Sequence, residues 1–403
     1  MGFIAKYREE LKDVWEGFVA LTITTLGSGV TGMVFGLGNV IVAMKSSVLM
    51  IAPASMDMRG NIYSALGSRL GSLLHLGHIE PKISRNRLLI ENILGVLTLK
   101  TMFSLFIGVI ASLAYLYISG VLDIVDLTLI GFLTSFTALP IMLTVTFAIA
   151  FITFSKGLDP DNFSAPIITL AGDAISLPIL LISTYAILKI NLSLKYVMLI
   201  LSILLTVTLI SYVVSSKRTY LRRIVIESTP VLMICVFLEM FAGSVLTVNV
   251  ERILEQAGIL TIVPGFLENS GALAGILAAR LSTKLHLGEI EPKLLPSIKV
   301  AKEFVKVLII TLLIYPMLGA YSYGIAKILR LPIPTLGATV MSVLIAGVLL
   351  SIVVLFIVHY ISTMSFKKGL DPDNLTIPLI TSIIDAIGSY ILVYSLLMVS
   401  PYG

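Results

Sequence analysis

The sequence has a single cysteine, Cys235, and few charged side chains. One cysteine excludes an intrachain disulfide and any zinc site built from several cysteines. Charged residues make up 13% of the chain, whereas a soluble domain carries about 25%. Hydrophobic residues make up 57% of the 403 residues. This composition is that of a membrane protein rather than of a string of soluble domains.

The sequence also lacks the marks of several common binding proteins. The net charge of +5 comes with no stripe of basic and aromatic residues, so we expect no nucleic acid partner. The repeated Gly-Leu-Asp-Pro-Asp-Asn segments do not match the calcium loop of an EF-hand. Residues 1–13 are charged and are followed by a long apolar run without a clear cleavage site. We therefore expect this segment to be retained on the cytoplasmic side rather than removed as a signal peptide.

Long apolar runs dominate the rest of the chain, as in 127–154, 196–214 and 336–361. A helix needs roughly 20 apolar residues to cross a hydrocarbon layer of about 30 Å. The runs are long and do not alternate with polar residues, so we expect helices and not the strands of a barrel. The fold class is therefore an all-α polytopic membrane protein with about 11 transmembrane helices. The predicted spans lie near 16–44, 48–76, 98–120, 128–154, 164–188, 196–214, 228–248, 258–286, 303–326, 334–362 and 376–399.

Two halves of the chain carry the same motifs in the same order. Residues 75–82 read His-Leu-Gly-His-Ile-Glu-Pro-Lys, and residues 286–293, 211 positions later, read His-Leu-Gly-Glu-Ile-Glu-Pro-Lys. The seven residues Lys-Gly-Leu-Asp-Pro-Asp-Asn occur at 156–162 and again at 368–374, 212 positions later. Chance is a poor explanation for such a run. We infer one internal duplication with a single-residue insertion or deletion.

The duplication predicts the organisation of the chain. We expect a first five-helix repeat at 1–190, a linker transmembrane helix and cytoplasmic loop at 191–225, and a second five-helix repeat at 226–403. Five spans alone would invert the second copy, and the linker helix restores the same orientation. Parallel repeats are related by a pseudo-twofold axis along the membrane normal. The excess of Lys and Arg on one side predicts a cytoplasmic N-terminus and a C-terminus outside the cell membrane.

Four carboxylates fall inside predicted helices as two matched pairs, Asp57 with Glu268 and Asp173 with Asp385. An acid at the centre of a bilayer costs about 2.5–3.5 kcal/mol on insertion scales, so such residues are candidates for function. Carboxylates are hard oxygen ligands of the kind that Mg²⁺ prefers. Repeats around a common axis can bring all four acids to one cation pathway. The alternative is that each acid only forms a hydrogen bond to a neighbouring helix.

Hydroxyl groups accompany two of these acids. Thr169 precedes Asp173 by four residues, and Thr381 precedes Asp385 by the same spacing. Residues four apart lie on the same face of a helix. We therefore include both threonines among the candidate metal ligands.

Amide side chains accompany the other two acids. Asn61 lies one helical turn after Asp57, and Asn269 directly follows Glu268. The position matched to Asn61 in the second half is Ala272, so the two copies differ here. Asn61 and Asn269 complete the set of candidate ligands.

Other residues in the same region allow more than one interpretation. Pro53 and Pro264 are expected inside the second helix of each copy, where each would free a carbonyl group for a cation or cause an ordinary packing kink. Arg59 either neutralises Asp57 in the empty state or reaches the membrane interface. Glu239 is an acid in an apolar run without a counterpart, and we assign it no role.

The order of these motifs resembles a known family. Leu-Asp-Pro followed by Pro-x-x-Thr-x-x-x-Asp, at 158–173 and 370–385, resembles the last two helices of MgtE-type magnesium transporters. Arg-Gly-Asn at 59–61, followed by Ser-Arg-Leu at 68–70, resembles their second helix. The tandem arrangement with an extra helix between the halves looks most like solute carrier family 41. The resemblance covers nearly the whole chain.

The resemblance implies a five-helix unit used twice, with one chain supplying both units as a monomeric pseudo-dimer. It implies a pore for Mg²⁺ lined by the second and fifth helices of both units. The family's pore aspartate falls on Asp173 and Asp385, and its Gly-Asn motif on 60–61. In the second half, Gly-Ala stands at the matched positions 271–272.

An alternative function is that of an aspartyl intramembrane protease, with Asp173 and Asp385 as the catalytic pair. Such enzymes are expected to carry Gly-x-Gly-Asp at one site. The chain has Leu-Ala-Gly-Asp at 170–173 and Ser-Ile-Ile-Asp at 382–385, and neither fits. A membrane scaffold without transport would gain little from the cost of buried acids. We therefore predict a transporter of divalent cations, not an enzyme.

Overall fold

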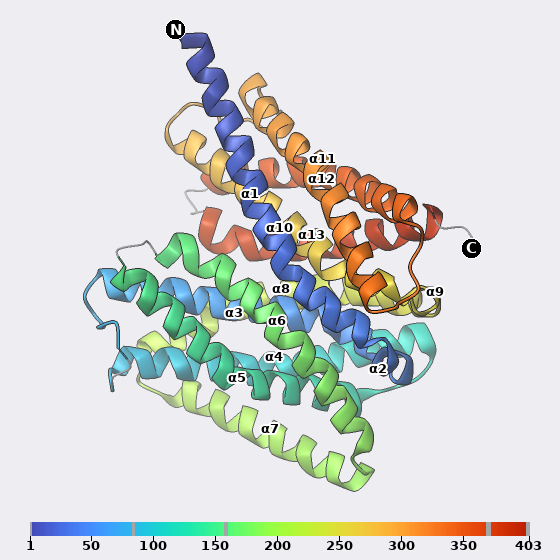
Figure 1. Ribbon diagram of the computed structural model, residues 1–403. Helices are drawn as coiled ribbons and strands as arrows, with labels where there is room; N and C mark the ends of the chain where they lie inside the picture. Colours follow the sequence, from blue (N-terminus) through green and yellow to red (C-terminus); the bar gives the residue numbers. More distant parts are fainter. Residues whose placement is uncertain (1, 83–84, 157–159, 368–371, 400–403) are drawn as a thin grey trace. The chain divides into compact units, whose positions relative to one another are not determined.

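The structure is a computed structural model, and it describes residues 2–82, 85–156, 160–367 and 372–399 (Figure 1). Within these ranges, the side chains of residues 2–12, 160–167, 169–170, 372–378 and 399 are not part of the description. The described residues form helices and no strand. This confirms the all-α fold class.

Each of the eleven predicted spans corresponds to a long helix in the described part of the chain. These helices are α1 (Gly2–Leu37), α3 (Val48–His75), α4 (Arg87–Ser119), α5 (Ile124–Ser155), α6 (Pro160–Lys189), α7 (Leu192–Ser215), α8 (Thr219–Val248), α10 (Val263–His286), α11 (Ile298–Ile328), α12 (Leu336–Lys367) and α13 (Pro372–Val399). Three short segments complete the described secondary structure, namely α2 (Asn39–Met44), α9 (Val250–Glu255) and the 3₁₀ helix η1 (Ala257–Thr261). Of the described long helices, 10 are apolar enough to cross a membrane by composition alone.

The exception is α3, which has 28 residues and is long enough to cross. It carries Asp57, Arg59, Asn61 and Arg69, and these make it more polar than its neighbours. Most of its side chains are buried against other helices. A helix of this kind is stable in a bilayer only inside a bundle, because lipid offers its polar groups no partners.

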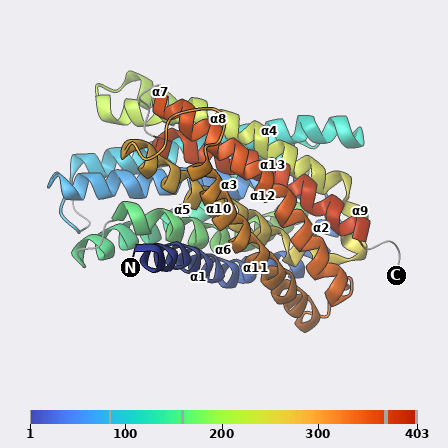
Figure 2. The ribbon, with the colours of Figure 1, turned by 90° about the horizontal axis from the view of Figure 1, so that it is seen from above.

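The described chain packs as two compact units. Unit 2 contains Val40–Val248, and unit 1 contains Met1–Asn39 together with Asn249–Gly403. In unit 1, α1 packs against α10, α11 and η1, and both views show it beside α11 (Figures 1 and 2). In unit 2, α8 packs against α3 and α4. The first helix of each repeat is therefore exchanged. Helix α1 of the first repeat packs in unit 1 with the rest of the second repeat, and α8 of the second repeat packs in unit 2 with the rest of the first.

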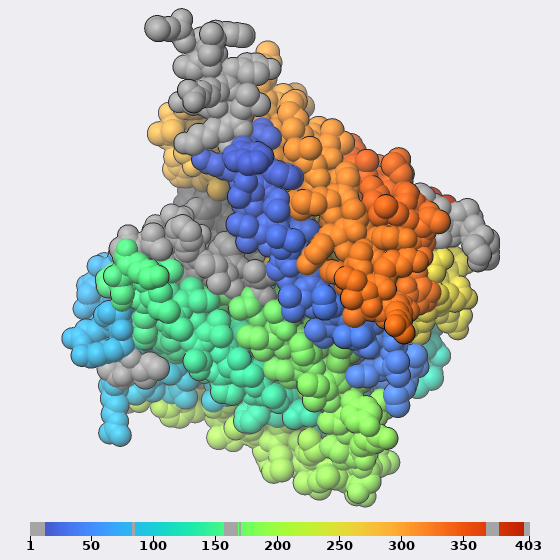
Figure 3. Space-filling model, viewed as in Figure 1, coloured from blue at the N-terminus to red at the C-terminus, as the bar shows by residue number. Residues whose placement is uncertain are grey.

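Matched glycines allow these exchanged helices to pack closely. A Cβ atom on Gly32 of α1 would lie 2.3 Å from the carbonyl oxygen of Thr261, and one on Gly243 of α8 would lie 2.3 Å from that of Met50. Gly32 and Gly243 are 211 positions apart, as are Met50 and Thr261. In Figure 3 the atoms of α1 also lie directly against those of α11. Both units are thus assembled by the same glycine contact.

The repeated His-Leu-Gly motif ends a helix in each unit. Gly77 and Gly288 both have φ of +69°, in the left-handed region that glycine adopts without strain. The Gly77 N–H donates to the carbonyl of Leu74 at 3.0 Å, and the Gly288 N–H to that of Leu285 at 3.1 Å. These are helix-terminating turns, so this motif is explained by local structure.

The two prolines of the second helices have different positions. Pro53 lies inside α3, as predicted. Pro264 lies in the first turn of α10, directly after η1. The expectation that it interrupts a helix is therefore wrong, because a first-turn residue donates no intrahelical hydrogen bond that proline could remove.

A network of charges at one end of unit 2 joins the start of α3 to α5 and α7. Lys45 Nζ lies 2.8 Å from Asp123 and 2.9 Å from Asp126, and Lys195 Nζ lies 2.8 Å from the other oxygen of Asp126. Ser47 donates to Asp123 at 2.7 Å. Burial alone would lower the pKa of Lys45, but its two carboxylate partners raise it above the ordinary value.

The glycine contacts generate a first prediction. Gly32→Ala and Gly243→Ala should each lower the free energy of unfolding by about 1–3 kcal/mol, because the new methyl group meets a backbone carbonyl. Thermal unfolding in detergent measures this. Gly324→Ala is the matched control, since nothing lies within 4 Å of its added Cβ. Equal stability of all three variants would contradict the close contacts.

The helix exchange generates a second prediction. The loop between α7 and α8 can be opened between Ser216 and Lys217 by expressing residues 1–216 and 217–403 as two chains. A tag on either fragment should retrieve the other, because each supplies the first helix of the other's unit. Each fragment expressed alone should aggregate, which affinity purification and size-exclusion chromatography would show. Two fragments that are each monodisperse and do not associate would contradict the exchange.

Candidate functional site

Two acidic residues of unit 2 lie on neighbouring helices. Asp57 lies near the middle of α3 and Asp173 near the middle of α6, and these two helices pack against each other. Both side chains are partly buried. Asp173 is close enough to Asp57 and Arg59 to interact electrostatically with both. Unit 2 therefore brings two of the predicted acids together, and one of them, Asp173, interacts with a buried arginine.

The amide of Asn61 is attached to the first of these acids. Its Nδ2 donates a hydrogen bond of 2.7 Å to Oδ2 of Asp57, one helical turn away. This bond restricts the rotamers of the carboxylate. Asn61 and Asp57 thus form a prearranged pair of oxygen-bearing side chains on one face of α3.

A third acid joins this group from α8. The Glu239 side chain is 1% exposed, and one of its carboxylate oxygens lies within 4.8 Å of one from Asp57. Two carboxylates this close repel each other unless a proton or a cation lies nearby. From the sequence alone we assigned no role to Glu239, because the matched position 211 residues earlier holds Ser28 and not a second acid. The available signal was an acid alone in an apolar run.

Unit 1 repeats the arrangement on α10 and α13. These helices pack together and carry Glu268, Thr381 and Asp385, all partly buried. A Cβ atom on Gly271 would lie 3.5 Å from Cγ2 of Thr381. The two helices therefore meet closely about one turn from each acid.

Two further predicted ligands have different outcomes. Asn269 is fully buried, and its Nδ2 donates to the carbonyl of Gly265 and to Oγ1 of Thr25, both at 2.9 Å. Its amide therefore fastens α10 to α1. The backbone of Thr169 belongs to α6, but its side chain lies outside the described part of the chain.

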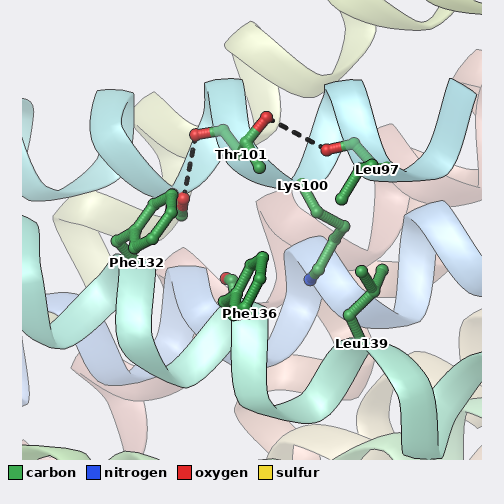
Figure 4. A pocket seen from close by; sticks show the side chains of 8 residues that line it. Leu97, Lys100, Thr101, Phe132, Phe136 and Leu139 are labelled. Atoms are coloured by element: carbon green, nitrogen blue, oxygen red, sulfur yellow. Dashed lines mark hydrogen bonds between the residues drawn. The ribbon is translucent and has the colours of Figure 1, made fainter. Parts of the chain in front are cut away.

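A small pocket in unit 2 lies between α4 and α5. Figure 4 shows Lys100 extending from α4 to the level of Phe136 and Leu139 on α5. The remaining lining residues are Leu97, Thr101, Ser104, Phe132 and Ser135. The lining contains no carboxylate, so this pocket does not suit a divalent cation.

Comparison with known proteins identifies relatives over most of the chain. The MgtE family profile, described as a divalent cation transporter, matches residues 52–183 and 263–395. Solute carrier family 41 member 2 from Mus musculus is 23% identical over 87% of this chain, and the protein of that name from Gallus gallus is 23% identical over 93%. Member 3 from Rattus norvegicus is 22% identical over 87%.

These alignments cover 64%, 68% and 79% of the three relatives, so the chain spans about two thirds of the first two. No solved structure matches the chain. The two profile matches fall on the two duplicated halves, one on each. The comparisons give no support to the aspartyl protease alternative.

The different contacts of the two asparagines generate a third prediction. Asn269→Ala should lower the free energy of unfolding by about 1–3 kcal/mol, because it leaves buried groups on α1 and α10 without their partner. Asn61→Ala should cost less, since Asn61 is only partly buried and its bond lies within one helix. Thermal unfolding of both variants in the same detergent measures the difference. A larger loss for Asn61→Ala would contradict this assignment.

Proposed function

The chain belongs to the MgtE family of divalent cation transporters, and we propose that it moves Mg²⁺ across a cell membrane along a path lined by the acidic helices of both units. The observation that carries this proposal is the matched burial of acids. Asp57 and Asp173 lie on packed helices in unit 2, and Glu268 and Asp385 lie on the matched packed helices in unit 1.

The chemistry of Mg²⁺ suits such a path. Mg²⁺ takes six oxygen ligands at about 2.0–2.1 Å and gives up its waters reluctantly. A path that holds the ion through its own waters needs only a few carboxylates at suitable spacing. Partly buried acids, which keep access to water, can serve this purpose better than fully enclosed ones. The same carboxylates would accept Mn²⁺ in place of Mg²⁺.

The proposed ligands come from both units. Asp173 and Asp385 supply the principal charges, each near the middle of its helix. Asp57 with Asn61 and Glu268 supply oxygen ligands from the second helix of each repeat. We add Glu239 to the unit 2 group because of its distance from Asp57. Thr169 and Thr381 would supply hydroxyl ligands, and Asn269 is assigned to packing instead.

The same proposal includes orientation and assembly. The positive-inside rule supports a cytoplasmic N-terminus and a C-terminus outside the membrane. Because one chain supplies both units, a single copy would form the complete path as a pseudo-dimer. The exchange of α1 and α8 supports a single-chain pseudo-dimer, since each unit contains helices from both repeats.

A fourth prediction tests the acids directly. Asp173→Asn and Asp385→Asn should each reduce Mg²⁺ uptake into proteoliposomes at least tenfold, because each removes a charge that offsets the dehydration of the ion. A magnesium-sensitive dye inside the vesicles measures the uptake. Glu227→Gln is the control, because Glu227 is 61% exposed and paired with Arg223 away from the acids.

Two results would count against the proposed function. The wild-type protein, reconstituted and monodisperse, would show no uptake of Mg²⁺ or Mn²⁺ above empty vesicles. Alternatively, both aspartate variants would transport as fast as the Glu227→Gln control.

A further inference from the structure

Arg59 is the largest side chain that the described structure buries completely, with 0% exposure. Its Nε donates a hydrogen bond of 2.8 Å to the carbonyl of Ser55, one turn earlier on α3. Enclosure on all sides rules out the alternative in which Arg59 reaches the membrane interface. The guanidinium therefore has its place inside unit 2.

The two terminal nitrogens of Arg59 are buried without a hydrogen-bond partner among the residues that the structure describes. Arginine stays protonated in proteins, and a buried charge costs several kcal/mol unless an opposite charge compensates it. Asp173 on α6 interacts electrostatically with this guanidinium. The arginine thus faces a carboxylate at a distance, without a closed, fully hydrogen-bonded ion pair.

A second buried cation lies in the same unit. Lys100 on α4 is 3% exposed, and its Nζ lies 5.4 Å from the centre of the ring of Tyr63. Tyr63 follows Arg59 by one helical turn on α3. A cation over an aromatic face gains part of the stabilisation that water would otherwise provide. Lys100 and Arg59 also interact electrostatically, as like charges that repel each other. Unit 2 therefore buries a second basic side chain close enough to Arg59 to interact with it.

Unit 1 has neutral side chains at every matched position. Ser270, Ala274 and Thr311 stand 211 positions after Arg59, Tyr63 and Lys100. Ser270 shares a hydrogen bond of 2.7 Å with Tyr315, and Thr311 shares one of 2.8 Å with Ser351. Uncharged hydrogen bonds thus replace the buried cations. The acids of unit 2 therefore have a buried arginine nearby, whereas the matched position in unit 1 holds the neutral Ser270.

We propose that Arg59 is a tethered counter-cation that competes with the transported divalent cation for the carboxylate of Asp173 in unit 2. An incoming ion loses part of its attraction to Asp173 because a fixed positive charge already interacts with that carboxylate. The acids of unit 1 meet no such charge at the matched position, so unit 2 binds the ion more weakly and releases it faster. Arg59 acts here as a specificity-determining residue, and the inference rests on the proposed transport function.

The test compares variants that separate charge from volume. Arg59→Met removes the charge and keeps an elongated side chain, whereas Arg59→Lys keeps the charge. In proteoliposomes, Arg59→Met should lower the KM for Mg²⁺ about tenfold and lower kcat, because the ion binds more tightly and leaves more slowly. Arg59→Lys should keep the KM within about twofold of the wild-type value. The affinity of the detergent-purified proteins for Mn²⁺, measured by calorimetry, should follow the same order.

Lys100→Met keeps the inference falsifiable if Arg59→Met does not yield a monodisperse protein. It should lower the KM in the same direction by a smaller factor, since Lys100 acts from farther away on the next helix. A KM that is unchanged or raised in Arg59→Met, or in Lys100→Met if that variant alone folds, would overturn the inference. A wild-type protein that transports no divalent cation would instead overturn the proposed function, so the two failures are distinguishable.

Discussion

The cost of a charge in a lipid environment is the constraint on which this structure depends. Lipid supplies no partners for carboxylates or guanidinium groups, so each must be covered and compensated within a bundle of helices. The clearest case is α3, which carries Asp57, Arg59 and Asn61 and packs against four other long helices of unit 2, namely α4, α5, α6 and α8. The acid-bearing α6 is one of them, and α8 adds Glu239. The helices that cover the polar groups are thus the helices that carry further carboxylates.

Duplication produced two units, but the units do not coincide with the two repeats along the chain. Because α1 packs in unit 1 and α8 in unit 2, each unit depends on a helix from the other repeat. The matched contacts of Gly32 and Gly243 show that both first helices dock in the same way. This exchange makes the single chain the functional unit in our account. Because both units belong to one polypeptide, their sequences can also diverge. The neutral residues at the positions matched to Arg59 and Lys100 are an example.

The sequence predicted the helical fold, the number of long helices and the repeat, because apolar length and exact motif recurrence are local signals. The family resemblance implied a pore lined by the second and fifth helices of each repeat, and in unit 2 these two helices, α3 and α6, pack against each other. The sequence did not predict the exchange of α1 and α8. The two helices are duplicates with similar surfaces, so the apolar pattern does not show which unit each one packs against. Nor did it place Pro264 at the start of α10, because the break at η1 depends on packing. The burial of Arg59 and the proximity of Glu239 to Asp57 required the folded bundle, since each depends on the helices around it.

On the proposed path, a divalent cation meets the partly buried carboxylates of both units. The most direct measurement is anomalous X-ray scattering from crystals of the protein soaked in Mn²⁺, which locates the ion independently of any transport assay. We predict a Mn²⁺ peak bound to the carboxylates of Asp173 and Asp385, either directly or through ordered waters. Crystals in which these two side chains face lipid, with Mn²⁺ bound only elsewhere, would contradict the account.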